Sequence, residues 1–150
     1  MRLQRQGINE CQLATIAMLA DVPLLKIRTR ALEIAQIPTW TGYFVTPPAL
    51  RLINFWSIMS ILCGEYGVHM TLPNTNTGVT PGEAPTINLS GKGQITIIWD
   101  NGAAHAMAYE NGIVYDSNAT EPMLWDVWLS KEANTYKLCG IKSIIVSPCR

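Results

Sequence analysis

Cys11 carries a nucleophilic side chain at the very start of an apolar segment. Residues 9–20 read NECQLATIAMLA, in which only Gln12 and Thr15 are polar after the cysteine. With Asn9 as the N-cap and Gln12 three residues later, the pattern predicts a helix over Glu10–Ala20. A thiol in the first turn of a helix lies near unpaired backbone N–H groups, which favour its thiolate form. Cys11 is therefore a candidate nucleophile, and the alternative is a small residue that merely fills the core.

His105 and Asp116 belong to a predicted β-hairpin in the second half of the chain. Its turn contains Asn111-Gly112, a pair that favours a tight hairpin connection. Pairing Glu110 with Ile113 would leave His105 and Asp116 a few residues apart on neighbouring strands, within reach of each other through a bulge or the length of the carboxylate side chain. Each residue also has a simpler interpretation: His105 could be a buried histidine bonded to a backbone carbonyl, and Asp116 could be an Asx-turn residue.

Together, these three residue types meet the needs of thiol catalysis. A thiolate attacks a carbonyl carbon, an imidazole shares its proton with the thiol, and a third group fixes the tautomer of the imidazole. The oxyanion that forms also needs N–H donors. The backbone N–H of Cys11 is one candidate donor, and the side-chain amides of Gln4 and Gln6 both qualify by their chemistry.

The segments NECQLATIAMLADVP and AAHAMAYENGIVYDSN resemble the two active-site segments of papain-like cysteine peptidases. The resemblance is closest to the small bacteriocin-processing branch and its phage and bacterial relatives, and it covers these segments and the order of elements. It implies a papain-like fold with Cys11 as nucleophile, His105 as general base and acid, and Asp116 as the orienting residue. By the same resemblance, Gln6 or Gln4 is the oxyanion donor.

What the resemblance implies for function is hydrolysis of a peptide or isopeptide bond in a protein or peptide substrate, with no cofactor and no metal. A phage-encoded protein of this kind would act in the host cytoplasm. Three positions depart from the family pattern: Gln12 replaces the glycine that usually follows the cysteine, the upstream glutamine is slightly displaced, and Asp116-Ser117-Asn118 lacks the usual proline. The last departure makes Asn118 a rival orienting residue.

Two other functions remain open at this stage. The same acyl-enzyme chemistry serves deamidases and acyl transferases that act on a host protein. A papain-like scaffold could also work as a binding module, such as a phage-type inhibitor, without catalysis.

The secondary-structure elements that must position the site change from helices to strands near residue 68. Helical periodicity comes first, and short strands separated by Gly, Asn and Pro turns come afterwards, which predicts an α+β fold with N-terminal helices packed on a C-terminal antiparallel sheet. A length of 150 residues suits one domain, 1–150. The expected helices are Glu10–Ala20, Leu24–Gln36, 46–66 and 121–130; the expected strands are 68–72, 94–99, 103–109, 113–116 and 141–146, with a long loop over 73–86.

Composition favours a core-forming protein with no strongly charged surface. The chain is 48% hydrophobic and 15% charged, and its eleven basic and eleven acidic residues cancel. This balance argues against a nucleic-acid partner or an anionic membrane surface. The N-terminus has no secretion signal, and the segment 49–63, with its narrow polar stripe, is expected to be a buried helix; both observations favour a cytoplasmic protein.

The remaining cysteines and aromatic residues receive structural readings. No CxxC pair is present, so a zinc site is not expected and four free thiols are the simplest interpretation, although Cys139 and Cys149 could pair under oxidising conditions. The connector 38–48 contains three aromatic residues that could form the wall of a substrate cleft or a satellite of the core: Trp40, Tyr43 and Phe44. Trp125 and Trp128 are assigned to the core.

Overall fold

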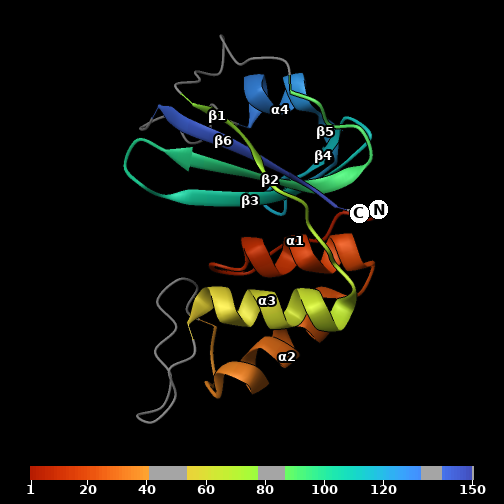
Figure 1. The fold of residues 1–150 in the computed structure, drawn as a ribbon, viewed down its shortest axis with the longest axis vertical. Coiled ribbons are helices and arrows are strands. Elements are labelled where there is room, and N and C mark those ends of the chain that lie inside the picture. The colour runs from red at the N-terminus through yellow and green to blue at the C-terminus, as the bar shows by residue number, and fades with distance from the viewer. Residues whose placement is uncertain (41–53, 78–86, 133–139, 150) are drawn as a thin grey trace.

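The computed structural model describes residues 1–40, 54–77, 87–132 and 140–149. Within them the chain forms four helices and a six-stranded antiparallel sheet of order β1-β6-β2-β3-β4-β5. This confirms the expected α+β class, with the N-terminal helices on one side of the sheet and α4 on the other (Figure 1). The helices are α1 (Cys11–Ala20), α2 (Leu24–Ala35), α3 (Phe55–Tyr66) and α4 (Trp125–Lys131); the strands are β1 (Asn74–Thr77), β2 (Lys92–Trp99), β3 (Ala104–Glu110), β4 (Ile113–Tyr115), β5 (Met123–Leu124) and β6 (Ile141–Pro148).

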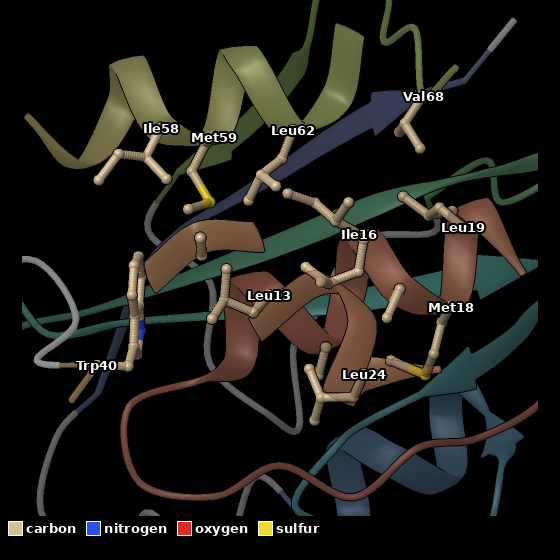
Figure 2. Close-up of a cluster of buried hydrophobic side chains, with 14 of the residues drawn as sticks. Leu13, Ile16, Met18, Leu19, Leu24, Trp40, Ile58, Met59, Leu62 and Val68 are labelled. Carbon is tan, nitrogen blue, oxygen red and sulfur yellow. The ribbon is translucent and has the colours of Figure 1, made fainter. Parts of the chain in front are cut away.

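Helix α1 is the central helix and lies between the sheet and the helices α2 and α3 (Figure 1). All its residues from Gln12 to Leu19 are buried, which explains why its sequence has no polar face. Figure 2 shows how Leu13 and Ile16 of α1 meet Leu62 of α3 in the helical core. This packing fixes the position of the helix that begins with Cys11.

A second core lies between the sheet and α4. Strand side chains alternate between the two faces, so Ile95, Ile97, Met107 and Tyr109 point toward Trp128 of α4. Alternate residues of the same strands, such as Ala108, face α1 instead. By this alternation, His105 belongs to the face that α4 covers.

The β3–β4 hairpin has the predicted register. Glu110 lies opposite Ile113, and the ladder ends where Ala108 lies opposite Tyr115. Asn111 and Gly112 both have positive φ, 48° and 84°, as the favoured two-residue hairpin turn requires. The turn chemistry therefore sets the register that brings the end of β4 toward His105.

The start of α1 differs from the prediction in one respect. Glu10 is the N-cap, not Asn9, and Cys11 is the first residue of the helix rather than the second. Asn9 instead has φ 57°, a left-handed conformation that asparagine tolerates well, and its carbonyl accepts a hydrogen bond from the indole of Trp40. The predicted N-cap thus turns the chain into the helix without capping it.

Several other boundaries were wrong. Residues 68–72 form no strand: they make one bridge between Met70 and Cys149 and a backbone bond from Thr71 to Pro148. The expected loop 73–86 begins with β1, which pairs with β6 at the sheet edge; its residues 78–86 lie outside the described part. The predicted helix 121–130 is β5 followed by α4.

Helix α3 is shorter and more exposed than a buried helix over 49–63 would be. It begins at Phe55, where the side chain of Asn54 accepts a hydrogen bond from the backbone of Ser57; the expected start at 46 lies outside the described residues. Its buried face is Phe55, Ile58, Met59 and Leu62. Trp56 is 59% exposed and Ile61 is 38% exposed, so two large apolar side chains of this helix are accessible to solvent.

Candidate active site

The Cys11 thiol lies at the mouth of α1 and has three hydrogen-bond partners. The side chain of His105 bonds to the sulfur, and the backbone N–H groups of Ala106 and Gln12 donate to it. The Gln12 N–H belongs to the first turn of α1, where backbone donors have no intrahelical acceptor. The sulfur therefore sits among groups that favour its anionic form.

The cysteine and the histidine meet at an edge of strand β3. The β3–β4 ladder stops at Ala108, so β4 does not extend alongside His105 and Ala106. The N–H of Ala106 is turned to the Cys11 sulfur there. Cys11 lies on the face of the sheet that α1 covers, whereas the His105 side chain starts on the face that α4 covers. The two side chains meet where the β3–β4 ladder ends.

Asp116 holds the imidazole from the other side. Its Oδ1 lies 2.7 Å from Nε2 of His105, and both side chains are buried. Because Nε2 is engaged by the carboxylate, Nδ1 is the ring nitrogen that faces the thiol. The structure thus brings the three predicted residues, Cys11, His105 and Asp116, into one hydrogen-bonded chain.

The carboxylate of Asp116 has two further donors that keep it in place. Trp128 Nε1 donates to Oδ2 at 2.8 Å, and the backbone N–H of Asn118 donates to Oδ1 at 2.9 Å. Trp128 was predicted as a core residue and is fully buried, but its role in orienting Asp116 was missed. A tryptophan in an apolar segment gives no sequence signal that its N–H points at a carboxylate.

Burial and hydrogen bonding compete in setting the charges of the site. Burial raises the pKa of Cys11, but the bond and charge of His105 and the two backbone N–H groups outweigh it, so the pKa lies below 9.0. For His105, burial lowers the pKa, yet Asp116 and Cys11 raise it to about 9. Burial raises the pKa of Asp116, and its bonds to His105, Trp128 and Asn118 bring the pKa below 3.8. These directions favour a thiolate, an imidazolium and a carboxylate in line.

The two candidate oxyanion donors occupy different places. Gln4 bonds away from the site: its Nε2 donates to the carbonyl of Val22 and its Oε1 accepts from the N–H of Leu24. The structure therefore places the Gln4 amide at the other end of α1 from Cys11, and Gln6 stays the candidate oxyanion donor. Gln6 lies beside the site: its Nε2 donates to Oδ1 of Asn118, and its backbone N–H donates to the carbonyl of Ser117.

Asn118, the rival orienting residue, is thus linked to Gln6 as well as to Asp116. Its side chain accepts from Gln6 and its backbone donates to Asp116, whereas the bond to Nε2 of His105 comes from Asp116. An amide nitrogen carries two hydrogens, so the bond to Asn118 leaves Gln6 Nε2 a second hydrogen. Within the described part of the chain, the buried Oε1 atom of Gln6 has no hydrogen-bond partner.

Gln12, which follows the nucleophile, turns away from it and joins the helix to the sheet. Its Nε2 donates to Oε1 of Gln94 at 2.6 Å, and Gln94 Nε2 donates back at 3.0 Å. Gln94 also donates to the hydroxyl of Thr96. The two residues are 82 positions apart, so no local pattern indicates this buried amide pair.

Glu10, the residue before the nucleophile, is neutralised by α2. Its carboxylate is buried and forms two bonds to the guanidinium of Arg28, at 2.9 and 2.7 Å. An unpaired carboxylate at this place would oppose a thiolate at Cys11. The ion pair therefore protects the charge balance of the site as well as the packing of α2 on α1.

The other candidate residues lie elsewhere. Trp40 is buried against Phe55 and does not form an exposed cleft wall, while Tyr43, Phe44 and Cys139 lie outside the described residues. Cys63 and Cys149 are free thiols, and burial raises the pKa of Cys63 to about 11. In the part of the chain that the structure describes, no cluster of His, Cys, Asp and Glu could hold a metal ion, and no helix has the length and apolarity needed to cross a membrane.

Comparisons with known proteins do not assign the chain to a family. No protein-family model, no curated protein and no solved structure matches it. The site is therefore defined by its own geometry: a helix-mouth thiol, a buried imidazole and a carboxylate joined in that order.

Proposed function

We propose that the protein is a papain-like cysteine hydrolase that cleaves a peptide or isopeptide bond through an acyl-enzyme. The observation that carries the proposal is the bonded chain from the Cys11 sulfur through His105 to Asp116. Its support is electrostatic as well as geometric, because the pKa of Cys11 is lowered and that of His105 is raised to about 9. A nucleophile, a base and an orienting carboxylate in mutual contact are the parts that acyl transfer needs.

In the first half-reaction, the Cys11 thiolate attacks the substrate carbonyl carbon. A C–S bond forms, and the carbonyl π electrons move to the oxygen. The N–H of Cys11, which starts the helix and has no intrahelical acceptor, and the second hydrogen of Gln6 Nε2 are the proposed donors to this oxyanion. The C–N bond then breaks, and the leaving nitrogen takes the proton from the His105 imidazolium.

The second half-reaction regenerates the thiolate. Neutral His105 takes a proton from a water molecule, and the resulting hydroxide attacks the thioester carbonyl. The C–S bond breaks, the carboxylic acid product leaves, and the site returns to the thiolate–imidazolium pair. Asp116, held by Trp128, keeps the ring in one orientation during both proton transfers.

Mass spectrometry of a proteome-derived peptide library tests this function against the acyl-transfer alternatives. We expect chain scission by the native protein and none by Cys11→Ala, with Cys149→Ala as a matched control that retains activity. A gain of about one dalton at glutamine would identify a deamidase, and cross-linked peptides would identify a transferase. Identical peptide masses with the native chain and with Cys11→Ala would contradict the proposal.

A further inference from the structure

One short turn contacts both the buried imidazole and the proposed oxyanion donor. It is the segment Asp116-Ser117-Asn118, which follows β4 and which we call the Asp116 turn. Its first residue lies 2.7 Å from Nε2 of His105, and the side chain of its third residue accepts a hydrogen bond from Nε2 of Gln6. The residue that orients the imidazole and the residue that bonds to Gln6 are therefore two positions apart.

Local hydrogen bonds fix the shape of the Asp116 turn. The backbone N–H of Asn118 donates to Oδ1 of Asp116 at 2.9 Å, and the N–H of Ala119 donates to the carbonyl of Asp116 at 2.9 Å. Asp116 and Ser117 are buried, whereas Asn118 is exposed. Neither of these two bonds uses the side chain of Asn118, so a smaller side chain there leaves both in place.

The main chain of Gln6 is attached to the same turn. Its N–H donates to the carbonyl of Ser117 at 3.1 Å, a bond that involves no side chain. The side-chain amide of Gln6 needs a separate contact, because several rotatable bonds lie between it and the main chain.

The side chain of Asn118 provides that contact. Its Oδ1 accepts a hydrogen bond from Nε2 of Gln6, whereas the buried Oε1 of Gln6 has no hydrogen-bond partner among the described residues. Nε2 carries a second hydrogen, which is the proposed donor to the oxyanion. A donor that is already in place stabilises a transition state better than one that must first be ordered.

We infer that Asn118 is a positioning residue, which holds the amide of Gln6 where the oxyanion forms. This inference rests on the proposed function, since it concerns the donors of that same site. It gives Asn118 a different task from orienting His105, because the bond to Nε2 of His105 comes from Asp116. One turn thus positions both the imidazole and the oxyanion donor.

Nuclear magnetic resonance of the Gln6 side chain tests the inference without turnover. The ¹⁵N order parameter of Gln6 Nε2 should be near the value of about 0.85 that is typical of rigid backbone, and it should fall below about 0.6 in Asn118→Ala. Equal order in the two chains would overturn the inference.

Two further variants show whether the acceptor oxygen is what matters. In Ser117→Ala the order of Gln6 should be unchanged, because the buried hydroxyl of Ser117 has no hydrogen-bond partner in the described part of the chain. Asn118→Asp retains an acceptor oxygen, so Gln6 should also stay ordered. Loss of order in either variant would contradict the role given to Oδ1 of Asn118.

A kinetic double-mutant cycle tests whether the position of Gln6 matters for the reaction. In Asn118→Ala, kcat for a peptide that the native chain cleaves should fall about 10-fold with KM little changed. In the Gln6→Ala background the same substitution should have no further effect, because the amide that Asn118 holds is already absent. Equal losses of kcat in both backgrounds would overturn the inference.

Alkylation by iodoacetamide separates the inference from the proposed function. The sulfur of Cys11 displaces iodide and forms a thioether, so no oxyanion arises and Asn118→Ala should react at the native rate. Slower alkylation in this variant would mean that Asn118 acts on the Cys11–His105 pair, which contradicts the inference. If Cys11 of the native chain is not labelled selectively, the proposed function fails, and the order parameter of Gln6 still decides the role of Asn118.

Discussion

At the scale of single residues, the site depends on a small number of hydrogen bonds with separate tasks. The sulfur of Cys11 is surrounded by donors from His105 and from two backbone N–H groups, so burial does not keep it protonated. His105 is held between the thiol and Asp116, and its pKa of about 9 keeps the ring charged at neutral pH. Gln6 bonds to the side chain of Asn118, two residues after Asp116.

The role of Gln6 in holding the oxyanion can be separated from that of Gln4. In Gln6→Ala, kcat for a cleaved peptide should fall about 10²- to 10³-fold, because one donor to the transition state is lost. In Gln4→Ala, kcat should stay unchanged, although losing the bonds to Val22 and Leu24 should cost about 1 kcal/mol of stability. Steady-state kinetics and urea unfolding measure the two effects, and an unchanged kcat in Gln6→Ala would remove it from the oxyanion site.

The reacting residues of the site could be predicted from their types, but the hydrogen bonds that hold them in place could not. Cys11, His105 and Asp116 are chemically distinctive and lie in an order that thiol catalysis uses, and the Asn111-Gly112 turn set the hairpin register. The N–H of Trp128 gave no signal, because an indole in an apolar segment is compatible with ordinary core packing. Its direction toward Asp116 depends on how α4 packs on the sheet.

At the scale of elements, α4 is what keeps Asp116 in place. Trp125 and Trp128 of this helix stack with ring centroids 5.6 Å apart, but only Trp128 donates its N–H to the carboxylate. The N–H of Trp125 is buried and has no hydrogen-bond partner among the residues that the structure describes. Two stacked indoles with different hydrogen bonding provide an internal control for the function of the helix.

Replacing each tryptophan by phenylalanine should therefore have different effects. Trp128→Phe leaves Oδ2 of Asp116 without that donor and should cost about 1–3 kcal/mol of stability at neutral pH. Trp125→Phe removes an unsatisfied donor and should change stability little. Chemical unfolding of both variants, with Trp125→Phe as the control for lost ring area, measures the difference. Equal losses of stability would mean that ring packing alone explains Trp128.

The pH dependence of Trp128→Phe distinguishes orientation of the carboxylate from packing. The pKa of Asp116 is lowered below 3.8 in the folded chain, so its contribution to stability is present above that value and is lost as pH falls through the folded pKa. Without the Trp128 donor the folded pKa rises, and the acid-unfolding midpoint should move to higher pH. An unchanged midpoint would show that the indole N–H does not stabilise the charge.

Element boundaries were predictable only where local chemistry decides them. The hairpin and α2 follow from their turn residues and periodicity, whereas β1 has the polar sequence NTNT and forms because β6 offers it an edge. Residues 68–72 are more apolar than β1, yet they form only one bridge. Strand pairing depends on partners distant in sequence, and intrinsic preference is a weak guide to it.

At the scale of the whole molecule, the site lies where a helical layer meets a sheet. Helix α1 packs on α2 and α3 on one side and on β3 on the other, so the position of Cys11 relative to His105 depends on both packings (Figure 1). The Gln12–Gln94 amide pair is a polar connection across this boundary, one residue from the nucleophile. The helical layer and the sheet could be predicted from the sequence. The Gln12–Gln94 contact could not, because it depends on how α1 packs on β2.

A double-mutant cycle measures how strongly this pair joins the layers. Gln12→Met or Gln94→Met alone should cost about 1–3 kcal/mol, because each leaves a buried amide without its partner. The double variant should cost less than the sum of the two, since both amides are then gone. Urea unfolding provides the four free energies, and additive losses would mean that the two side chains act independently.

His105 lowers the pKa of Cys11, so that the thiolate persists at pH values below 9.0, the usual pKa of a thiol. Alkylation by iodoacetamide from mildly acidic to neutral pH, followed by peptide mass spectrometry, tests it most directly. We expect Cys11 to react much faster than Cys63, whose pKa is about 11, and faster than Cys149, whose pKa is also raised by burial. The advantage of Cys11 should disappear in His105→Ala. Labelling of Cys11 no faster than of Cys63, or an advantage that survives loss of the imidazole, would contradict the account.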